Sequence, residues 1–166
     1  MTMRLMHFSH KPIESLHRRE SIGRREYHKP VGFWVSEESN GDGWRDWCTS
    51  EDFGPGELAY DVELRPDANI RLVDTIEKLD ALTDEFGIQD NYMPSRYISK
   101  MDWPRFVALY DGILIVPYFW ERRLADHSSW YYSRDCASGC IWNPDAVASI
   151  VPARLPLPEL RREAAE

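Results

Sequence analysis

The segment 58–64 alternates apolar and polar residues, and this pattern constrains the fold more than any other in the chain. Its sequence is LAYDVEL. Side chains of a strand point alternately to opposite faces, so the pattern predicts a β-strand with one buried face. Apolar runs predict further strands over 4–9, 31–36, 69–73, 112–116, 130–133 and 140–142.

Helical spacing occurs in short stretches between these strands. Apolar residues three and four positions apart predict a helix over 74–86, capped by Asp74 or Thr75 and ended by Gly87. Shorter helical segments are predicted over 12–16, over 44–53 and, with Asp102 as the cap, over 104–110. Because strands and helices do not alternate regularly, the sequence predicts an α+β fold and disfavours a doubly wound sheet.

The length of 166 residues predicts one α+β domain over 1–151, followed by a C-terminal tail over 152–166 that is frayed or helical. A hydrophobic content of 43% is enough for a single core. The N-terminus lacks the apolar region of a signal peptide. Because the chain also lacks a stretch of roughly 20 apolar residues, we expect no membrane partner and a cytoplasmic location.

The net charge of −8 disfavours nonspecific binding to duplex nucleic acid, which requires a basic face. The charge is uneven, because the segment 17–29 carries Arg18, Arg19, Arg24, Arg25 and Lys29. Two interpretations stay open for this segment. It is either a solvated loop or helix face, or a local platform for a phosphate.

The three cysteines do not indicate a disulfide framework, because their number is odd. Cys136 and Cys140 are four positions apart and Cys48 is remote, which is not the spacing of a structural zinc site. The sequence therefore predicts reduced, buried thiols and no metal site.

Polar side chains inside two short apolar strands are the candidates for a binding site. His7 and Ser9 lie on the same face of the first predicted strand, and Ser36 lies in the second. Each could line a cleft, or could be satisfied by neighbouring backbone groups. Gly32 marks a close approach of a backbone or a ligand. The adjacent Phe33 and Trp34 offer flat aromatic faces to a ring-shaped ligand.

Acidic residues that could take part in chemistry are few. Asp111 precedes the strand predicted over 112–116, and Asp135 follows a Tyr-Tyr-Ser-Arg stretch. Asp135 could act as a general base or stabilise a developing positive charge, or could pair with Arg134 or a loop amide. His127 lies in a polar loop, where solvation is the simpler interpretation.

The motifs at the N-terminus resemble the ADP-ribosyltransferase-like fold, in particular its DNA-modifying toxin and RNA 2′-phosphotransferase branches. His7-Phe8-Ser9 matches the H-x-[ST] element of that family, and 32–36 matches its glycine-aromatic-x-Ser element. The resemblance implies mixed, mostly antiparallel small sheets with short helices around one cleft that binds NAD. It implies that His7 and Ser9 hold the adenosine-side ribose or the nicotinamide amide, and that Phe33 or Trp34 stacks on nicotinamide. The basic segment would then lie near the pyrophosphate or a nucleic-acid acceptor.

The sequence departs from this family at the catalytic glutamate, which the family places at the start of a late strand. No glutamate occurs between Glu121 and Glu159. Asp135 is the nearest acid, so we expect Asp135 and His7 to be the catalytic residues, unless Glu121 reaches the site or the chemistry is lost.

Three functions remain open on the sequence. The first is an NAD-dependent mono-ADP-ribosyltransferase-like protein that acts on a protein or nucleic-acid acceptor. The second is a non-catalytic protein-binding or inhibitor module on the same fold. The third is a nucleotide or nucleic-acid hydrolase that uses Asp111, Asp135 and His127 with Mg²⁺.

Overall fold

A seven-stranded, mostly antiparallel sheet forms the framework of the protein in the computed structural model, which describes residues 3–17, 28–93 and 97–154. The strand order is β4-β7-β8-β2-β1-β3-β9. The strands are β1 Leu5–Ser9, β2 Phe33–Glu37, β3 Leu58–Leu64, β4 Ile70–Val73, β7 Gly112–Ile115, β8 Ser138–Ile141 and β9 Val147–Pro152. Neighbouring strands are antiparallel except for β4 and β7, which are parallel.

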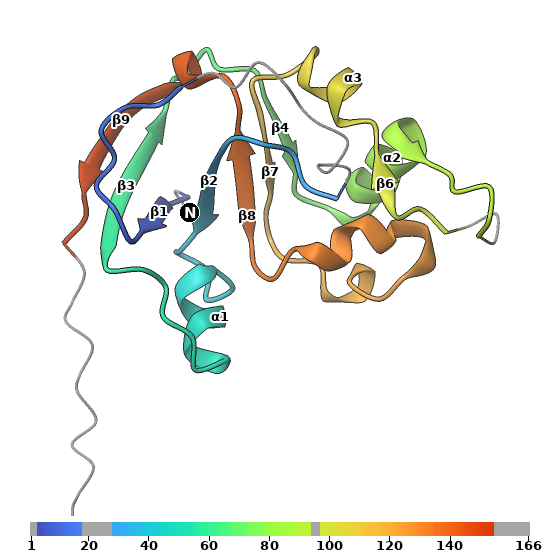
Figure 1. The fold of residues 1–166 in the computed structure, drawn as a ribbon, viewed down its shortest axis with the longest axis horizontal. Helices are drawn as coiled ribbons and strands as arrows, with labels where there is room; N and C mark the ends of the chain where they lie inside the picture. Colours follow the sequence, from blue (N-terminus) through green and yellow to red (C-terminus); the bar gives the residue numbers. More distant parts are fainter. Residues whose placement is uncertain (1–2, 18–27, 94–96, 155–166) are drawn as a thin grey trace, which may run out of the picture.

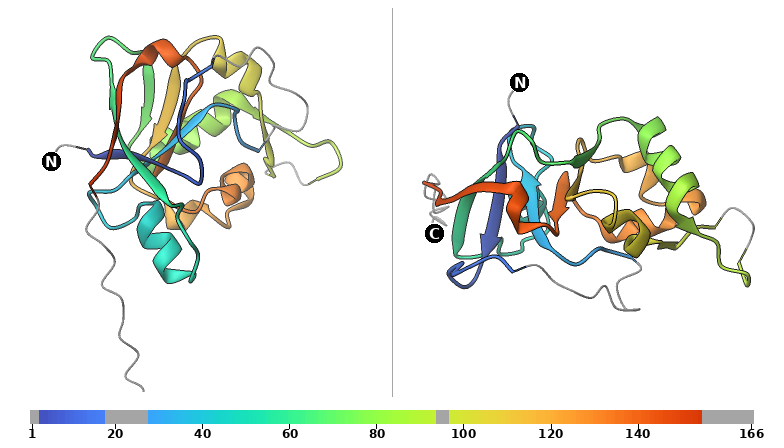
Figure 2. Two further views of the ribbon diagram at one scale, coloured as in Figure 1. Left: turned by 60° about the vertical axis from the view of Figure 1, so that its left-hand side comes forward. Right: turned by 90° about the horizontal axis from the view of Figure 1, so that it is seen from above.

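Helices and a two-stranded sheet complete the α+β fold. The α-helices are α1 Trp44–Ser50, α2 Ile76–Phe86 and α3 Trp103–Val107. The 3-10 helices are η2 Trp120–Arg122, η3 Asp126–Ser133 and η4 Pro144–Ala146, and the small sheet pairs β5 Gly87–Ile88 with β6 Lys100–Met101. The large sheet curls strongly, and α1 lies near the lower end of β2 (Figure 1). Helices α2 and α3 lie at the opposite end of the molecule from β9 and β3 (Figure 2).

The sheet is nearly divided between β1 and β2. These two strands pair only at Leu5–Glu37 and Met6–Ser36. Beyond that point β1 continues along β3 as far as Ser9, whereas β2 continues along β8. The sheet therefore consists of two halves, β9-β3-β1 and β2-β8-β7-β4, and the gap between them opens next to His7.

The core lies on the half of the molecule that carries α2 and α3. Leu79, Leu82 and Phe86 form the buried face of α2, as their helical spacing predicts. The strand β7 is buried along its whole length, which agrees with an apolar run that has no polar alternation. The fully buried Trp130 donates its Nε1–H to Thr83 Oγ1 at 2.9 Å, so the polar group of this indole has a hydrogen-bond partner.

Two predicted helix caps are present. Thr75 Oγ1 accepts a hydrogen bond from Lys78 N at 3.2 Å at the start of α2, and Asp102 Oδ1 accepts one from Arg105 N at 3.1 Å at the start of α3. Both side chains satisfy a backbone N–H that the first helical turn leaves without a partner.

Two predicted elements are wrong. Residues 12–16 form no helical turn, because one i,i+3 apolar pair does not offset the cost of nucleating a helix. Residues 130–133 belong to η3 and not to a strand. A short apolar run is compatible with either structure, and here packing of Trp130 and Tyr131 into the core decides for the helix.

The strand β9 is absent from the sequence-based prediction and forms an edge of the sheet beside β3. It extends to Pro152, which is compatible with an edge because proline lacks the N–H of a central strand. Ala153 N continues the contact by donating to Ala59 O at 2.8 Å. The rest of the predicted tail, 155–166, lies outside the described residues.

Candidate functional site

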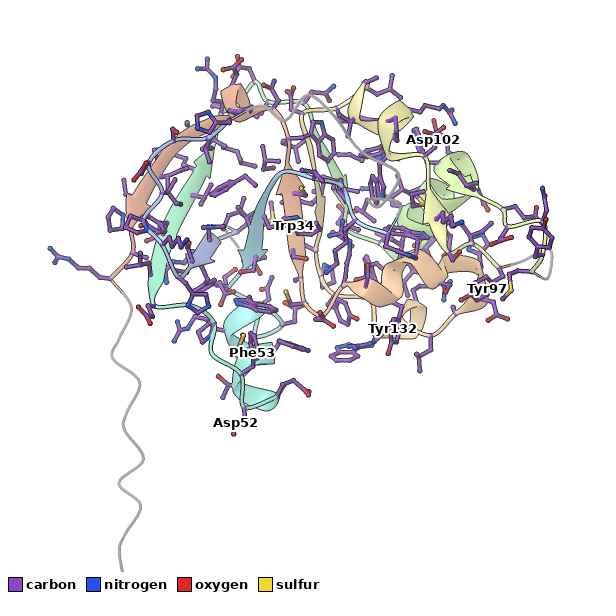
Figure 3. All side chains as sticks on the ribbon, in the orientation of Figure 1. Trp34, Asp52, Phe53, Tyr97, Asp102 and Tyr132 are labelled. Carbon is purple, nitrogen blue, oxygen red and sulfur yellow. The ribbon has the colours of Figure 1, made fainter. Side chains whose placement is uncertain are left out.

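A pocket of about 410 Å³ lies where β1 and β2 separate. Its lining includes 6–8 from β1, 34–36 from β2, 53–55 after α1, 134–136 before β8, and Lys29. In Figure 3 Trp34 lies near the middle of the curled sheet and Phe53 lies below it, on the segment after α1. The pocket is thus built from segments that are far apart in the sequence.

The structure brings four of the predicted site residues to this pocket. His7, Trp34, Ser36 and Asp135 all contribute to its lining. His7 and Ser36 reach it because they lie on either side of the point at which the two strands stop pairing. Asp135 reaches it from the turn before β8, which pairs with β2.

Ser9, Gly32 and Phe33 are not part of this lining. Ser9 Oγ lies in a local turn, donating to Lys11 O at 2.7 Å, which is the backbone alternative left open by the sequence. Gly32 is required by a neighbouring strand, because a Cβ atom there would lie 2.6 Å from Ile141 O. Phe33 packs against His7, with 4.4 Å between ring centroids, and faces a second, more open depression.

The His7 imidazole is held by the backbone of β2. Its Nδ1 lies 2.7 Å from Trp34 O, so Nδ1 carries the proton and donates, and Nε2 is the acceptor of the neutral ring. Partial burial lowers the pKa of His7, and the hydrogen bond to Trp34 O offsets part of that shift. His7 is therefore neutral at pH 7 and offers an acceptor to a ligand hydroxyl or amide.

Ser36 and Glu38 form a hydrogen-bonded pair that positions α1. The buried Ser36 donates from Oγ to Glu38 Oε1 at 2.6 Å, and the same oxygen accepts Trp44 N at 2.8 Å. Gly43 precedes α1 and has no side chain to cap it, so the Glu38 carboxylate takes that role. Sequence reasoning missed Glu38, because a cap from outside the local turn leaves no spacing signal.

Asp135 is the one carboxylate in the described lining of the pocket. Its side chain is 29% exposed, and Oδ1 lies 3.3 Å from Arg123 Nη2. The alternative in which Asp135 pairs with Arg134 does not occur, because the Arg134 guanidinium lies next to Trp34, with Cζ 5.0 Å from the ring centroid, and has no hydrogen-bond partner among the described residues.

Arg134 is a pocket residue whose role sequence reasoning missed, and Lys29 is a residue of the predicted basic segment that lines the same pocket. Arg134 is only 2% exposed. Its Nε, Nη1 and Nη2 have no hydrogen-bond partner in the described part of the chain. The Lys29 ammonium lies 5.5 Å from the centroid of the same Trp34 ring. In the sequence, the adjacent opposite charges of Arg134 and Asp135 suggested that the two side chains pair. The sequence therefore offered no reason to expect Arg134 as a cation of the pocket lining.

The other predicted catalytic candidates, Asp111, His127 and Glu121, lie outside the pocket lining. Asp111 joins two segments, accepting Asn69 N at 2.9 Å and Asn143 Nδ2 at 2.7 Å. His127 Nε2 lies 2.8 Å from Asp84 Oδ1, and Glu121 is exposed outside the pocket lining. Asp111, Asp135 and His127 therefore do not converge, and the described residues contain no group of three side chains suited to a metal ion.

Two further predictions concern the state of the three cysteines and the role of the basic segment 17–29. The three thiols are buried and form no disulfide. Burial raises the pKa of Cys48 to about 11 and that of Cys136 to about 12, so both stay protonated at neutral pH. Within the basic segment, residues 18–27 lie outside the described residues, and its predicted role as a phosphate platform stays a prediction.

Comparison with known proteins gives no match among family models, curated proteins or solved structures. The resemblance to the ADP-ribosyltransferase-like fold therefore stays a prediction. Within 3–17, 28–93 and 97–154, no helix has the length and apolar character needed to cross a membrane.

Proposed function

We propose that this protein is an NAD-dependent mono-ADP-ribosyltransferase-like enzyme that acts on a protein or nucleic-acid acceptor. One observation carries the proposal: His7, Trp34, Ser36 and Asp135 come from three separate segments and line one pocket between two diverging strands. The volume of about 410 Å³ falls in the range of pockets that bind small molecules.

Three of these residues, Trp34, His7 and Asp135, each suit a step of the proposed reaction. The Trp34 indole offers a flat face for the nicotinamide ring, and neutral His7 accepts a hydrogen bond from a ribose hydroxyl or the amide. The bond between nicotinamide and ribose C1 breaks, and its electron pair leaves with nicotinamide. The Asp135 carboxylate stabilises the positive charge that develops on the ribose. The acceptor then bonds to C1, and its proton passes to Asp135 or to water.

The test uses two samples of NAD, one labelled in the nicotinamide ring and one in the adenylate phosphate. We expect the protein to release nicotinamide and to transfer the adenylate label to a protein or nucleic-acid acceptor in equal amounts. Release without transfer would show an NAD hydrolase. Neither release nor transfer, together with no change of Tm on adding NAD, would exclude the enzyme.

A second candidate function is a non-catalytic module that binds a protein partner. The exposed aromatic residues Trp120 (62% exposed) and Tyr132 (56%) favour it. Both lie against Arg123, whose Cζ is 5.8 Å and 5.4 Å from their ring centroids. Exposed aromatic and arginine side chains are enriched at protein interfaces. Partner binding that Trp120→Ala weakens, in a protein without NAD turnover, would favour this alternative.

A further inference from the structure

Arg134 is a buried cation without the partners that such a group normally has. Its side chain is 2% exposed, and no described residue accepts a hydrogen bond from any of its three guanidinium nitrogens. Arg122 shows the usual arrangement, with Nε and Nη2 each 2.7 Å from an oxygen of Asp80. A buried charge left without partners destabilises the folded state, so a missing partner needs an explanation.

The backbone holds Arg134 firmly in this position. Tyr118 donates its hydroxyl proton to Arg134 O at 2.7 Å, and Arg134 N donates to Tyr131 O at 2.9 Å. Trp34 lies alongside the guanidinium, with its ring centroid 5.0 Å from Cζ. These two bonds fix the backbone of Arg134, and Trp34 limits the freedom of its guanidinium, which lowers the entropic cost of binding.

A second cation lies next to the same indole. The Lys29 ammonium is 5.5 Å from the Trp34 centroid, and its side chain remains accessible to solvent. Desolvation lowers the pKa of Lys29, repulsion from Arg134 lowers it further, and attraction to Asp135 offsets part of this shift. The neighbouring carboxylate, Asp135, is already bound to Arg123. The described lining of the pocket therefore holds two cations, Arg134 and Lys29, against one carboxylate, Asp135, which also pairs with Arg123.

We propose that Arg134 binds a phosphate or diphosphate group of the pocket's ligand, with Lys29, which is also next to Trp34, as the second cation. The planar guanidinium matches two phosphate oxygens at once, and a pair of cations suits a group with more than one negative charge. The inference rests on the proposed function in one respect, namely that the phosphate belongs to a nucleotide such as NAD.

The test compares the wild-type protein with Arg134→Met and with Arg65→Met as a matched control. Arg65 is exposed, pairs with Asp67 at 3.1 Å and lies outside the pocket lining. Inorganic pyrophosphate and ADP-ribose are titrated by calorimetry, with adenosine as the uncharged comparison. We expect Arg134→Met to weaken binding of both anions about tenfold to a hundredfold, because charge-assisted hydrogen bonds are lost. Arg65→Met should bind as the wild type does, and added salt should weaken wild-type binding.

The Tm without ligand separates a binding role from a structural one. A structural arginine would lower Tm when replaced, whereas an unpartnered buried charge should leave Tm unchanged or raise it in Arg134→Met. If Arg134→Met does not fold, Arg134→Lys, which keeps the charge and loses the planar fork, decides by the same titrations.

Failure of this inference and failure of the proposed function give different results. Pyrophosphate and ADP-ribose that bind Arg134→Met as tightly as the wild type, or that do not bind the wild type, overturn the anion site. Arg134-dependent binding of ADP-ribose without nicotinamide release would keep the anion site and exclude the transferase. Nicotinamide release with a KM for NAD that Arg134→Met leaves unchanged would keep the enzyme and overturn the anion site.

Discussion

His7 Nδ1 lies 2.7 Å from the carbonyl oxygen of Trp34, just beyond the last paired residues of β1 and β2. This hydrogen bond links the two halves of the sheet through two residues that line the pocket. It also sets the tautomer of the imidazole, so the same contact supports the fold and determines which nitrogen is left for a ligand.

The stability of the protein should depend on pH through His7. Burial lowers the pKa of His7 below its ordinary value of 6.5, so the unfolded chain takes up a proton at a higher pH than the folded chain. The stabilising contribution of neutral His7 is therefore complete above pH 6.5 and is lost as the pH falls through the lowered pKa. Urea unfolding of the wild type and of His7→Gln from about pH 5 to about pH 8 measures it. A stability difference between the two proteins that does not change with pH would contradict this assignment.

Replacement of Asp135 should reduce the proposed activity without unfolding the protein. We expect Asp135→Asn to lower the kcat of nicotinamide release by a factor on the order of one hundred or more, because the developing positive charge loses its carboxylate. The Tm should change little, since the ion pair of Asp135 with Arg123 is partly exposed. Glu121→Gln is the matched control. Full activity in Asp135→Asn and loss of activity in Glu121→Gln would transfer the role to Glu121.

A methyl group at Gly32 should destabilise the junction of β2 and β8. The added Cβ would lie 2.6 Å from Ile141 O and 2.7 Å from Cys140 Sγ. We expect Gly32→Ala to lower the free energy of unfolding by about 1–3 kcal/mol, the usual effect of overpacking. Gly54→Ala is the control, because an added Cβ meets nothing within 4 Å there. Equal unfolding free energies of the two variants in urea titrations would be incompatible with the close approach of Gly32 to β8.

The ion pair between Asp80 and Arg122 should stabilise the contact of α2 with η2. Its two 2.7 Å hydrogen bonds lower the pKa of Asp80 below 3.8, so the stabilisation is present above pH 3.8 and is lost as the pH falls through the lowered pKa. At neutral pH, Asp80→Asn should lower the free energy of unfolding by about 1 kcal/mol or less, because both side chains are partly solvated. Asp67→Asn, in a fully exposed pair, should have no measurable effect. An Asp80→Asn variant as stable as the wild type would show that the pair contributes nothing.

Local patterns predicted the elements whose structure depends on a few neighbouring residues. The strand over 58–64 follows from strict alternation, and the caps Thr75 and Asp102 follow from side chains that reach an N–H three residues away. The strand predicted over 130–133 was wrong, because four residues are too few to distinguish the alternation of a strand from the spacing of a helix. The strand β9 was missed because its residues become a strand only by pairing with β3.

Some residues of the candidate site could likewise be predicted from local sequence, and others could not. The positions of His7 and Ser36 within short apolar strands indicated side chains that face an opening, and both line the pocket. Asp135 was predicted because it is the nearest acid to the expected strand. Its ion pair with Arg123 could not be predicted, because the fold alone brings these two side chains together.

Hydrophobic periodicity and side-chain capping act within a few residues, so the chain alone specified the α+β class, most strand positions and the polar groups at the ends of two helices. Which of those groups meet was decided by pairing between distant segments. The short contact of β1 with β2 opens the pocket, and the turn before β8 buries Arg134 beside Trp34. The free-energy cost of burying the Arg134 charge depends on the whole packed structure, because desolvation is a property of all the surrounding atoms and not of the local sequence.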